Sequence, residues 1–428
     1  MIITTINFVY FQVKFFMSDC CSAPGLLPFE QALADMLAQV TPISDVISLP
    51  IDQALSYVLG QDIHSPLNVP PHNNSAMDGY AFEIKSFLTS GTLTLVGCSM
   101  AGAPYQGECK LGECVRIMTG AKIPNNCDSV EMQENVHVDQ QKITFLKEKI
   151  TKGSHVRNTG EDIQKHQKVL SKGHRLSTID IGILASLGVA EVRVYRPLNI
   201  ALIATGNELK LPGQVLTDGD IFASNSFFLA AILKKFNVNV IDFGVINDDF
   251  QAIKKAFVAA DKQADAVIST GGVSVGDADY TKDVLDELGD IGFWKVAIKP
   301  GKPFAFGLLP NSLFFGLPGN PVSALVTFHQ LALIALTKLQ NAEPINRTVL
   351  KVITTTELRK STGRMDFQRG VLSLNEQGEN VVTSTGSQSS GILSSLAVAN
   401  CYIILPADQG KVSAGEIVTV QVFDDYIR

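Results

Sequence analysis

The chain has 428 residues, of which 46% are hydrophobic and 18% are charged, and its formal net charge is −7. This length predicts two to four domains, and the composition is that of a well-packed soluble protein. The acidic balance excludes broad binding to nucleic acids or acidic membranes, because both need a dense positive surface. An anionic ligand must therefore be held by a local group of cations.

The cysteines indicate a reducing compartment. Seven of them occur without a Cys-x-x-Cys pair, and their odd number and low density do not predict a secreted disulfide framework. We therefore expect a cytoplasmic protein. Cys109 and Cys114 could form half of a zinc site, but no second pair of ligands follows nearby, so simple thiols are the better interpretation.

Residues 1–23 are predicted to be a disordered leader. The first 16 residues are apolar and aromatic, yet they lack a basic start, a small-residue cleavage site and the length to span a bilayer. Met17 is followed by polar residues and then by an amphipathic stretch, so we expect translation to begin there. Neither export nor membrane insertion is predicted.

Residues 24–196 are predicted to form an elongated helical linker domain with a small β domain inserted at about 72–160. Apolar residues at helical spacing predict helices at 29–40, 51–59 and 178–187. Short apolar runs broken by Gly, Pro and Asn predict strands at 93–96, 114–118 and 142–145. Because helices lie on both sides of these strands, we expect the β domain to be an insertion.

Residues 197–341 alternate between strand and helix patterns, which predicts a parallel α/β sheet. The predicted strands are 200–204, 238–245 and 266–270, and the predicted helices are 224–236, 250–260 and 321–339. The last helix begins with a proline, whose missing N–H loses no bond at that position. Residues 346–428 return to short β segments and predict a C-terminal, barrel-like β domain. The predicted fold class is therefore multidomain, α/β plus β.

The strand at 266–270 ends in Gly271-Gly272, which predicts a ligand cradle. Glycine has no Cβ, so the backbone turns sharply there and comes close to a ligand. Free N–H groups in such a turn suit phosphate, whereas Asp277 and Asp279 beside it repel an anion unless a divalent cation lies between. We predict an anion bridged by Mg²⁺, although Gly-Gly turns also follow strands in sheets without catalysis.

This loop disfavours several common chemistries. It lacks the Lys-Ser/Thr ending of the phosphate-binding loop of nucleotide hydrolases, and the chain has no Gly-x-Gly-x-x-Gly dinucleotide fingerprint. Ordinary kinase, GTPase and dehydrogenase functions are therefore not predicted.

Acidic residues follow successive predicted strands. Glu208 comes after the strand at 200–204, Asp248 after the strand at 238–245, and Asp279 beyond Gly271-Gly272. Ligands gather beyond the carboxyl ends of strands in an open parallel sheet, and Mg²⁺ prefers oxygen ligands. We therefore predict that these carboxylates converge on a metal, while capping of the next helix is the alternative role of Asp248.

Three lysines form a candidate anion site. Lys295, Lys299 and Lys302 lie on a segment that Pro300 and Pro303 should stiffen. Lysines are most often solvated surface charges. Their short spacing and the neighbouring prolines nevertheless favour a rigid site for an oxyanion.

Several ordered motifs extend this pattern along the chain. They are Asn74-Ser-Ala-Met-Asp-Gly-Tyr-Ala81, Arg116-Ile-Met-Thr-Gly-Ala-Lys-Ile-Pro124, Val156-Arg-Asn-Thr-Gly-Glu-Asp-Ile163, Gly316-Leu-Pro-Gly-Asn-Pro321, Gly363-Arg-Met-Asp-Phe-Gln-Arg-Gly370 and Gly386-Ser-Gln-Ser-Ser-Gly-Ile-Leu-Ser-Ser395. With the motifs above, they resemble the molybdopterin molybdenumtransferase family of molybdenum cofactor synthesis, which includes the carboxy-terminal domain of gephyrin. The resemblance covers about residues 24–425. Its departures are mild, since His72-Asn73 replaces the usual Phe-Asp, and Ser389 stands where glycine is common.

The resemblance implies that the protein takes adenylylated molybdopterin and molybdate, cleaves the adenylyl phosphoanhydride with Mg²⁺, and releases AMP. The implied catalytic residues are Asp279, Glu208 and Asp248, with Asp248 and Asp279 as metal ligands. The implied substrate-binding residues are Gly271, Gly272, Ser274, Lys295, Pro318 and Pro321, and the implied molybdate-binding residues are Lys299, Lys302, Arg369 and Ser390. Elongated homodimers in the family imply that the partner chain adds Asp78, Thr119 and Asp162. Molybdopterin adenylyltransferase and molybdoenzyme acceptors are implied as further partners.

Two other functions compete with this one. Molybdopterin adenylyltransferase resembles a single α/β domain with a Thr-Gly-Gly-Thr-Gly loop, whereas this chain has Thr270-Gly-Gly-Val-Ser-Val and further domains. A non-enzymatic scaffold of the gephyrin type is the second alternative. The predicted site keeps its charged groups, so we expect an enzyme.

Overall fold

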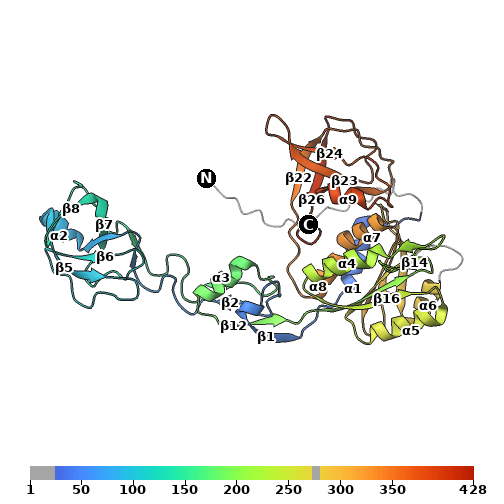
Figure 1. Ribbon diagram of the computed structural model, residues 1–428, viewed down its shortest axis with the longest axis horizontal. Helices are drawn as coiled ribbons and strands as arrows, with labels where there is room; N and C mark the ends of the chain where they lie inside the picture. The colour runs from blue at the N-terminus through green and yellow to red at the C-terminus, as the bar shows by residue number, and fades with distance from the viewer. Residues whose placement is uncertain (1–24, 272–279) are drawn as a thin grey trace. The chain divides into compact units, whose positions relative to one another are not determined.

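The computed structural model describes residues 25–271 and 280–428, and its chain divides into two compact units. Unit 1 comprises the residues up to Asp45 together with Arg196–Arg428, and unit 2 is Val46–Tyr195. Figure 1 labels many of the helices and strands of both units.

A six-stranded sheet in the order β7-β4-β6-β5-β9-β8 forms the small β domain of unit 2. Its strands are β4 Gly79–Phe82, β5 Thr92–Ser99, β6 Glu113–Ile117, β7 Ser129–Met132, β8 Val136–Asp139 and β9 Lys142–Phe145. The three predicted strands are thus confirmed as β5, β6 and β9. The short helix α2 Ile84–Thr89 and the 3₁₀ turn η2 Gln133–Asn135 accompany the sheet, and packed rings of Phe82, Phe87 and Phe145 form part of its core.

The rest of unit 2 consists of paired strands and one longer helix. The antiparallel pairs are β1 Val46–Pro50 with β12 Glu191–Tyr195, β2 Ile63–His64 with β11 Lys168–Leu170, and β3 Asn74–Ser75 with β10 Val156–Arg157. Helix α3 Thr178–Ser186 confirms the prediction at 178–187, and it begins with a capping box between Ser177 and Asp180.

The helix predicted at 51–59 is wrong. The segment makes a single 3₁₀ turn, η1 Ile51–Gln53. Ser56 then adopts a left-handed φ of 67°, which is unfavourable inside a helix, and Val58 and Leu59 form β-bridges with Arg175 and Val194. Backbone pairing with distant segments therefore outweighs the helical spacing of the apolar residues.

A six-stranded sheet in the order β16-β13-β17-β21-β20-β18 is the centre of unit 1. Its strands are β13 Asn199–Thr205, β16 Asn239–Ile246, β17 Ala266–Thr270, β18 Asp290–Lys295, β20 Pro303–Leu308 and β21 Leu313–Leu317. The first four strands in the order are parallel, as predicted, but β20 is antiparallel to its neighbours β21 and β18. The tight turn from Leu309 to Ser312 joins β20 to β21, and so short a connection permits only an antiparallel pair.

Helices cover both faces of this sheet. Helices α5 Phe250–Asp261 and α6 Tyr280–Leu288 enclose one apolar core, while α1 Phe29–Gln39, α4 Ser224–Lys235 and the helical run 321–339 enclose the other. The predicted helices α1, α4 and α5 are confirmed. The 321–339 run comprises α7 Pro321–Thr327, a π turn at Phe328–Ala332 and α8 Leu333–Leu339. Its mean hydropathy of 1.5 would suit a membrane, but 89% of it is buried inside the protein, as in a core helix.

The C-terminal β domain is a closed barrel. Strand β23 Met365–Leu374 pairs with both β24 Asn380–Ser384 and β25 Cys401–Leu405, and β22 Val349–Thr354 and β26 Ile417–Val422 complete the ring. The barrel contains the short helix α9 Ser394–Val398. The two-residue strand β19 Ile298–Lys299 leaves the α/β region and pairs in parallel with the start of β23. This pairing brings the barrel to the α/β sheet.

A buried polar network joins the π turn to the C-terminal segment. His329 is 1% exposed, and its Nε2 lies 2.7 Å from Asp424 Oδ2, while Gln330 Nε2 lies 3.3 Å from its Nδ1. Burial is the main cause that holds the pKa of His329 below its usual range. Burial alone would raise the pKa of Asp424, but the hydrogen bond from His329 and the charge of Arg347 outweigh it and lower that pKa. The neutral imidazole therefore donates to a carboxylate.

We predict that unit 1 loses stability as the pH falls below the usual histidine pKa of 6.5. Below that value the unfolded chain binds a proton at His329 that the folded protein does not, so the free energy of unfolding decreases. Thermal unfolding between about pH 7.5 and 5.5 measures this dependence. His329→Gln should remove part of it, whereas His64→Gln, at an exposed site of unit 2, should not. An unchanged pH dependence in His329→Gln would contradict the prediction.

Candidate functional site

A cleft of about 1020 Å³ opens in unit 1 at the carboxyl ends of β13 and β17. Its walls come from several parts of the chain. They include the ends of these strands, the paired strands β14 Leu209–Lys210 and β15 Ile221–Phe222 with the start of α4, the segments 299–303 and 318–323, and the barrel loop at 388–390. The cleft is therefore built jointly by the α/β sheet and the barrel.

The floor of the cleft depends on a close approach between two strand ends. Gly271 has a φ of +90°, and a Cβ at that position would lie 2.4 Å from Thr205 O. Glycine is therefore required for β17 to turn beside β13. Thr205 Oγ1 is buried and has no hydrogen-bond partner among the described residues. A hydroxyl left unpaired at a cleft wall is a candidate donor for a bound oxygen.

Two predicted acids line the cleft, Glu208 and Asp248. The neighbouring Asp249 caps α5, since its Oδ1 accepts the Ala252 N–H at 2.8 Å. Asp248 is thus not the helix cap, and instead it exchanges hydrogen bonds with Asn207 at the end of the adjacent strand, at 3.3 and 3.0 Å. The described residues hold no group of three or more His, Cys, Asp or Glu suited to a metal ion. A cation here would need oxygens from a substrate or from water.

The predicted cations occupy different positions. Lys299 and Lys302 line the cleft, and Lys299 Nζ lies 3.1 Å from Asp366 Oδ2 on the barrel. Lys295 is exposed on β18 and is not part of the lining. Gly301 permits a tight bend between the two lining lysines, since it has a φ of +106° and a Cβ would lie 2.4 Å from Thr327 Cγ2. The bend fixes the backbone between two cations.

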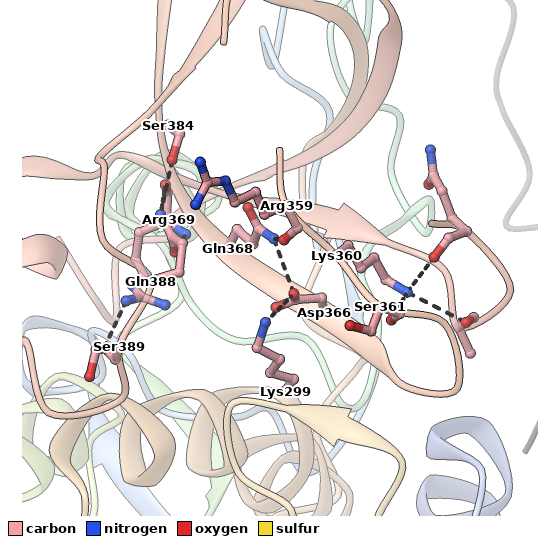
Figure 2. Close-up of polar contacts among 12 residues, drawn as sticks. Lys299, Arg359, Lys360, Ser361, Asp366, Gln368, Arg369, Ser384, Gln388 and Ser389 are labelled. Carbon is pink, nitrogen blue, oxygen red and sulfur yellow. Dashed lines mark hydrogen bonds and ion pairs between the residues drawn. The ribbon is translucent and has the colours of Figure 1, made fainter. Parts of the chain in front are cut away.

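Arg369 is placed behind the cleft wall. Its side chain is almost fully buried, and it is not among the residues that line the cleft. Its Nη2 donates to Ser389 O at 2.9 Å (Figure 2), and its Nε donates to Ser395 Oγ at 3.0 Å. Ser390, which was predicted with it, does line the cleft, as do Pro318 and Pro321.

Other predicted residues lie elsewhere. Gly272, Ser274 and Asp279 fall outside the described residues. Asp78, Thr119 and Asp162 belong to unit 2. Thr119 donates its backbone N–H and its hydroxyl to Asp78 Oδ1, both at 2.7 Å, and these bonds lower the pKa of Asp78. Asp162 is exposed.

Sequence reasoning missed several polar residues of the lining. They are Asn225, Asn320, Arg364 and Gln388. Arg364, Gln388 and Asn320 lie within the motifs at 363–370, 386–395 and 316–321. These motifs indicated a functional site, but they did not indicate which of their residues face the cleft. Asn225 had no such signal, and its Nδ2 now donates to Gly319 O at 2.7 Å, which ties α4 to the 318–320 loop.

Three protein-family models together match nearly the whole chain. Residues 27–188 match the MoeA N-terminal region, residues 201–338 match a probable molybdopterin binding domain, and residues 351–423 match the MoeA C-terminal region. These three matches follow one another in the order of the chain and include every described wall of the cleft.

Individual relatives agree with these matches. A molybdopterin molybdenumtransferase of Haemophilus influenzae is 44% identical over 93% of this chain and 99% of its own length. Gephyrin of Dictyostelium discoideum is 31% identical over 93% of this chain, which spans 62% of gephyrin. The crystal structure of a molybdopterin biosynthesis MoeA protein from Pyrococcus horikoshii OT3 superposes with a TM-score of 0.80 at 29% identity, covering 93% of this chain and all of that one. The chain belongs to the molybdopterin molybdenumtransferase family, together with the MoeA proteins and gephyrin.

Proposed function

We propose that this protein is a molybdopterin molybdenumtransferase that inserts molybdate into adenylylated molybdopterin and releases AMP in a Mg²⁺-dependent reaction. One observation carries the proposal: a single cleft joins lysines suited to a dianion with carboxylates at the strand ends. Similarity to the Haemophilus influenzae enzyme along nearly its full length supports the same activity.

The oxyanion half of the cleft is formed by Lys299, Lys302, Arg364 and the loop with Ser390. Charge-assisted hydrogen bonds from such donors suit a tetrahedral dianion such as molybdate. Lys299 is oriented by the buried carboxylate of Asp366. Among the described residues, Lys302 and Arg364 form no ion pair, so their charges are available to a ligand.

The nucleotide half of the cleft lies at the strand ends. We propose that Gly271, Gly272 and Ser274 hold phosphate, and that Lys295 adds positive charge nearby. Asp248 with Asp279 would hold Mg²⁺, and Glu208 would orient a water or a metal ligand. Two carboxylates fit this ion, because Mg²⁺ commonly binds to one or two carboxylates together with substrate phosphates and water. When bound, Mg²⁺ would neutralise charge on the phosphoanhydride.

Unit 2 of a second copy of the chain is proposed to contribute to the site. We propose a homodimer in which Asp78, Thr119 and Asp162 of the partner chain complete the substrate site. The hydrogen bonds from Thr119 lower the pKa of Asp78 and so favour its carboxylate form. Pro318 and Pro321 would shape the substrate-facing wall. Molybdopterin adenylyltransferase is the proposed supplier of the substrate, and molybdoenzymes are the proposed acceptors of the product.

The first test of this function is AMP release. Purified protein with adenylylated molybdopterin should release AMP only when both molybdate and Mg²⁺ are present. Asp248→Asn should lower the rate at limiting Mg²⁺ at least about tenfold, with partial recovery at high Mg²⁺, because a metal ligand is weakened. The matched control is Asp249→Asn, which changes the neighbouring charge but preserves a good helix cap. No AMP release by the wild type would leave the scaffold function as the alternative.

The second test separates the two halves of the cleft. Lys302→Ala should raise the half-saturating molybdate concentration about ten- to a hundredfold, because a charge-assisted bond contributes roughly 1.5–3 kcal/mol. Binding of the pterin nucleotide should change little. Lys351→Ala on the barrel, outside the cleft lining, serves as the control. An unchanged molybdate requirement in Lys302→Ala would refute its role.

A further inference from the structure

The barrel loop at 385–391, whose residues 388–390 line the cleft, has no helix or strand of its own. It begins where the β23–β24 ladder ends, at the pair Gly370 and Ser384. Thr385 N still donates to Arg369 O at 3.1 Å, and beyond it the chain leaves the ladder and enters the cleft wall. Its position must therefore be fixed by contacts other than strand pairing.

Gln388 replaces the missing strand partner with its side chain. Its Oε1 accepts the Arg369 backbone N–H at 2.8 Å, and its Nε2 donates to Arg369 O at 3.1 Å. An amide that binds both the N–H and the C=O of one strand residue reproduces the pattern of an antiparallel neighbour. The same Nε2 also lies 3.1 Å from Ser384 Oγ (Figure 2). Gln388 thus fastens the loop to β23.

The Arg369 guanidinium holds the same loop through a second set of bonds. It donates to Ser389 O at 2.9 Å, more weakly to Ser387 O at 3.4 Å, and to Ser395 Oγ at 3.0 Å. Burial is the main cause that lowers the pKa of Arg369. A buried guanidinium needs hydrogen-bond partners, and here loop carbonyl oxygens accept from Nη2 while the Ser395 hydroxyl accepts from Nε. Two of its three nitrogens are therefore bonded to residues behind the cleft wall.

The far side of the loop is fastened to the α/β sheet region. Ser390 O accepts the Val322 N–H at 3.1 Å, at the start of α7. The loop is thus held from the barrel by Arg369 and Gln388 and from the helix by Val322. Among the described residues, the hydroxyl groups of Ser389 and Ser390 have no hydrogen-bond partner, and both residues line the cleft.

We infer that Gln388 and Arg369 are positioning residues that fasten the 385–391 loop to β23 and thereby hold Ser389 and Ser390 as hydroxyl donors to the oxyanion. This inference rests on the proposed function, and it assigns Arg369 a role behind the loop instead of direct contact with molybdate. Fixed donors bind a tetrahedral anion more tightly than mobile ones, because less conformational entropy is lost on binding. Loss of either residue should therefore weaken oxyanion binding more than nucleotide binding.

The chain provides a matched control on the same strand. Asn400 Oδ1 accepts the Leu372 N–H at 2.6 Å, and Asn400 Nδ2 donates to Leu372 O at 2.8 Å. This side-chain amide makes the same pair of backbone bonds to β23 as Gln388 does, but Asn400 does not line the cleft. A purely structural role for Gln388 would make the two amides equivalent.

The experiment compares Gln388→Met with Asn400→Leu, each of which keeps the approximate shape of the side chain and removes its hydrogen bonds. Half-saturating molybdate, half-saturating pterin nucleotide, kcat and the unfolding temperature are measured in the full chain. Gln388→Met should raise the half-saturating molybdate concentration at least about tenfold and shift the nucleotide value less than about threefold. Asn400→Leu should lower the unfolding temperature comparably and leave both values unchanged. An equal change in molybdate requirement in the two variants would overturn the inference.

A double-mutant cycle tests whether the two residues act through one loop. Arg369→Lys keeps the positive charge but loses the fork that reaches Ser389 and Ser395 together. Its effect on molybdate should be at least about tenfold, and combination with Gln388→Met should add little, because a loop already released cannot be released again. Wild-type affinity in Arg369→Lys, or a double variant whose effect is the product of the single effects, would overturn the shared role.

Hydrogen exchange keeps this test independent of the proposed function. In the absence of substrates, amides at 386–391 should exchange faster in Gln388→Met than in the wild type, and should be unaffected in Asn400→Leu. Gln388→Glu is a milder variant for use if Gln388→Met does not fold, since it keeps the acceptor for Arg369 N but cannot donate to Arg369 O. Unchanged exchange in these amides overturns the inference, whereas a wild type without AMP release overturns only the proposed function.

Discussion

The cleft depends on a two-residue strand that joins two different sheets. Ile298 and Lys299 leave the α/β region and pair in parallel with Met365 and Asp366 at the start of β23. The same pairing places Lys299 Nζ 3.1 Å from Asp366 Oδ2. The backbone register and the ion pair thus support each other, and this contact is one of those that hold the barrel beside the strand ends, together with the bond from Val322 N–H to Ser390 O.

The cations of the cleft also explain how an acidic chain could bind an anion. With a net charge of −7, the protein as a whole repels an anion, so the cleft must hold one by short-range contacts. The charge of Lys299 is partly neutralised by Asp366. The ion pair therefore weakens the attraction of Lys299 for an anion, but it fixes the position of the ammonium group. Lys302 and Arg364 supply the remaining local charge. A site of this kind recognises geometry as much as charge, which suits a small tetrahedral dianion among many cellular anions.

Sequence patterns predicted the parts of the fold that follow from local periodicity. The strand at 266–270 and its glycine turn were predicted because a buried apolar run and a missing Cβ are both local properties. The helix at 51–59 was wrong, since β-bridges to distant residues decide its conformation. The reversed direction of β20 was likewise missed, because it is set by the tight turn to β21 and not by apolar content.

In the candidate site, too, some features follow from local sequence and others depend on distant contacts. Motifs located Lys299, Lys302 and Ser390 in the cleft wall, but spacing could not say which side of a strand or loop each side chain occupies. Arg369 and Arg364 are five residues apart at β23, yet one is buried behind the loop and the other faces the cleft. Likewise, Asp249 rather than Asp248 caps α5, because only the local backbone decides which carboxylate reaches Ala252 N. Such choices depend on three-dimensional register, which one sequence does not contain.

Division of the cleft between two sheets has a chemical consequence. The strand ends of the α/β sheet carry the carboxylates and the glycine turn, whereas the barrel contributes the 388–390 loop and the carboxylate that orients Lys299. In the proposed function, nucleotide and oxyanion would lie against different parts of the cleft wall, and the reacting atoms would meet where the sheet and the barrel touch. Proximity lowers a barrier only if both reactants are held within a narrow geometry. The rigidity of the 385–391 loop, which depends on side-chain amide and guanidinium bonds and not on a strand ladder, would therefore limit how precisely the oxyanion meets the pterin.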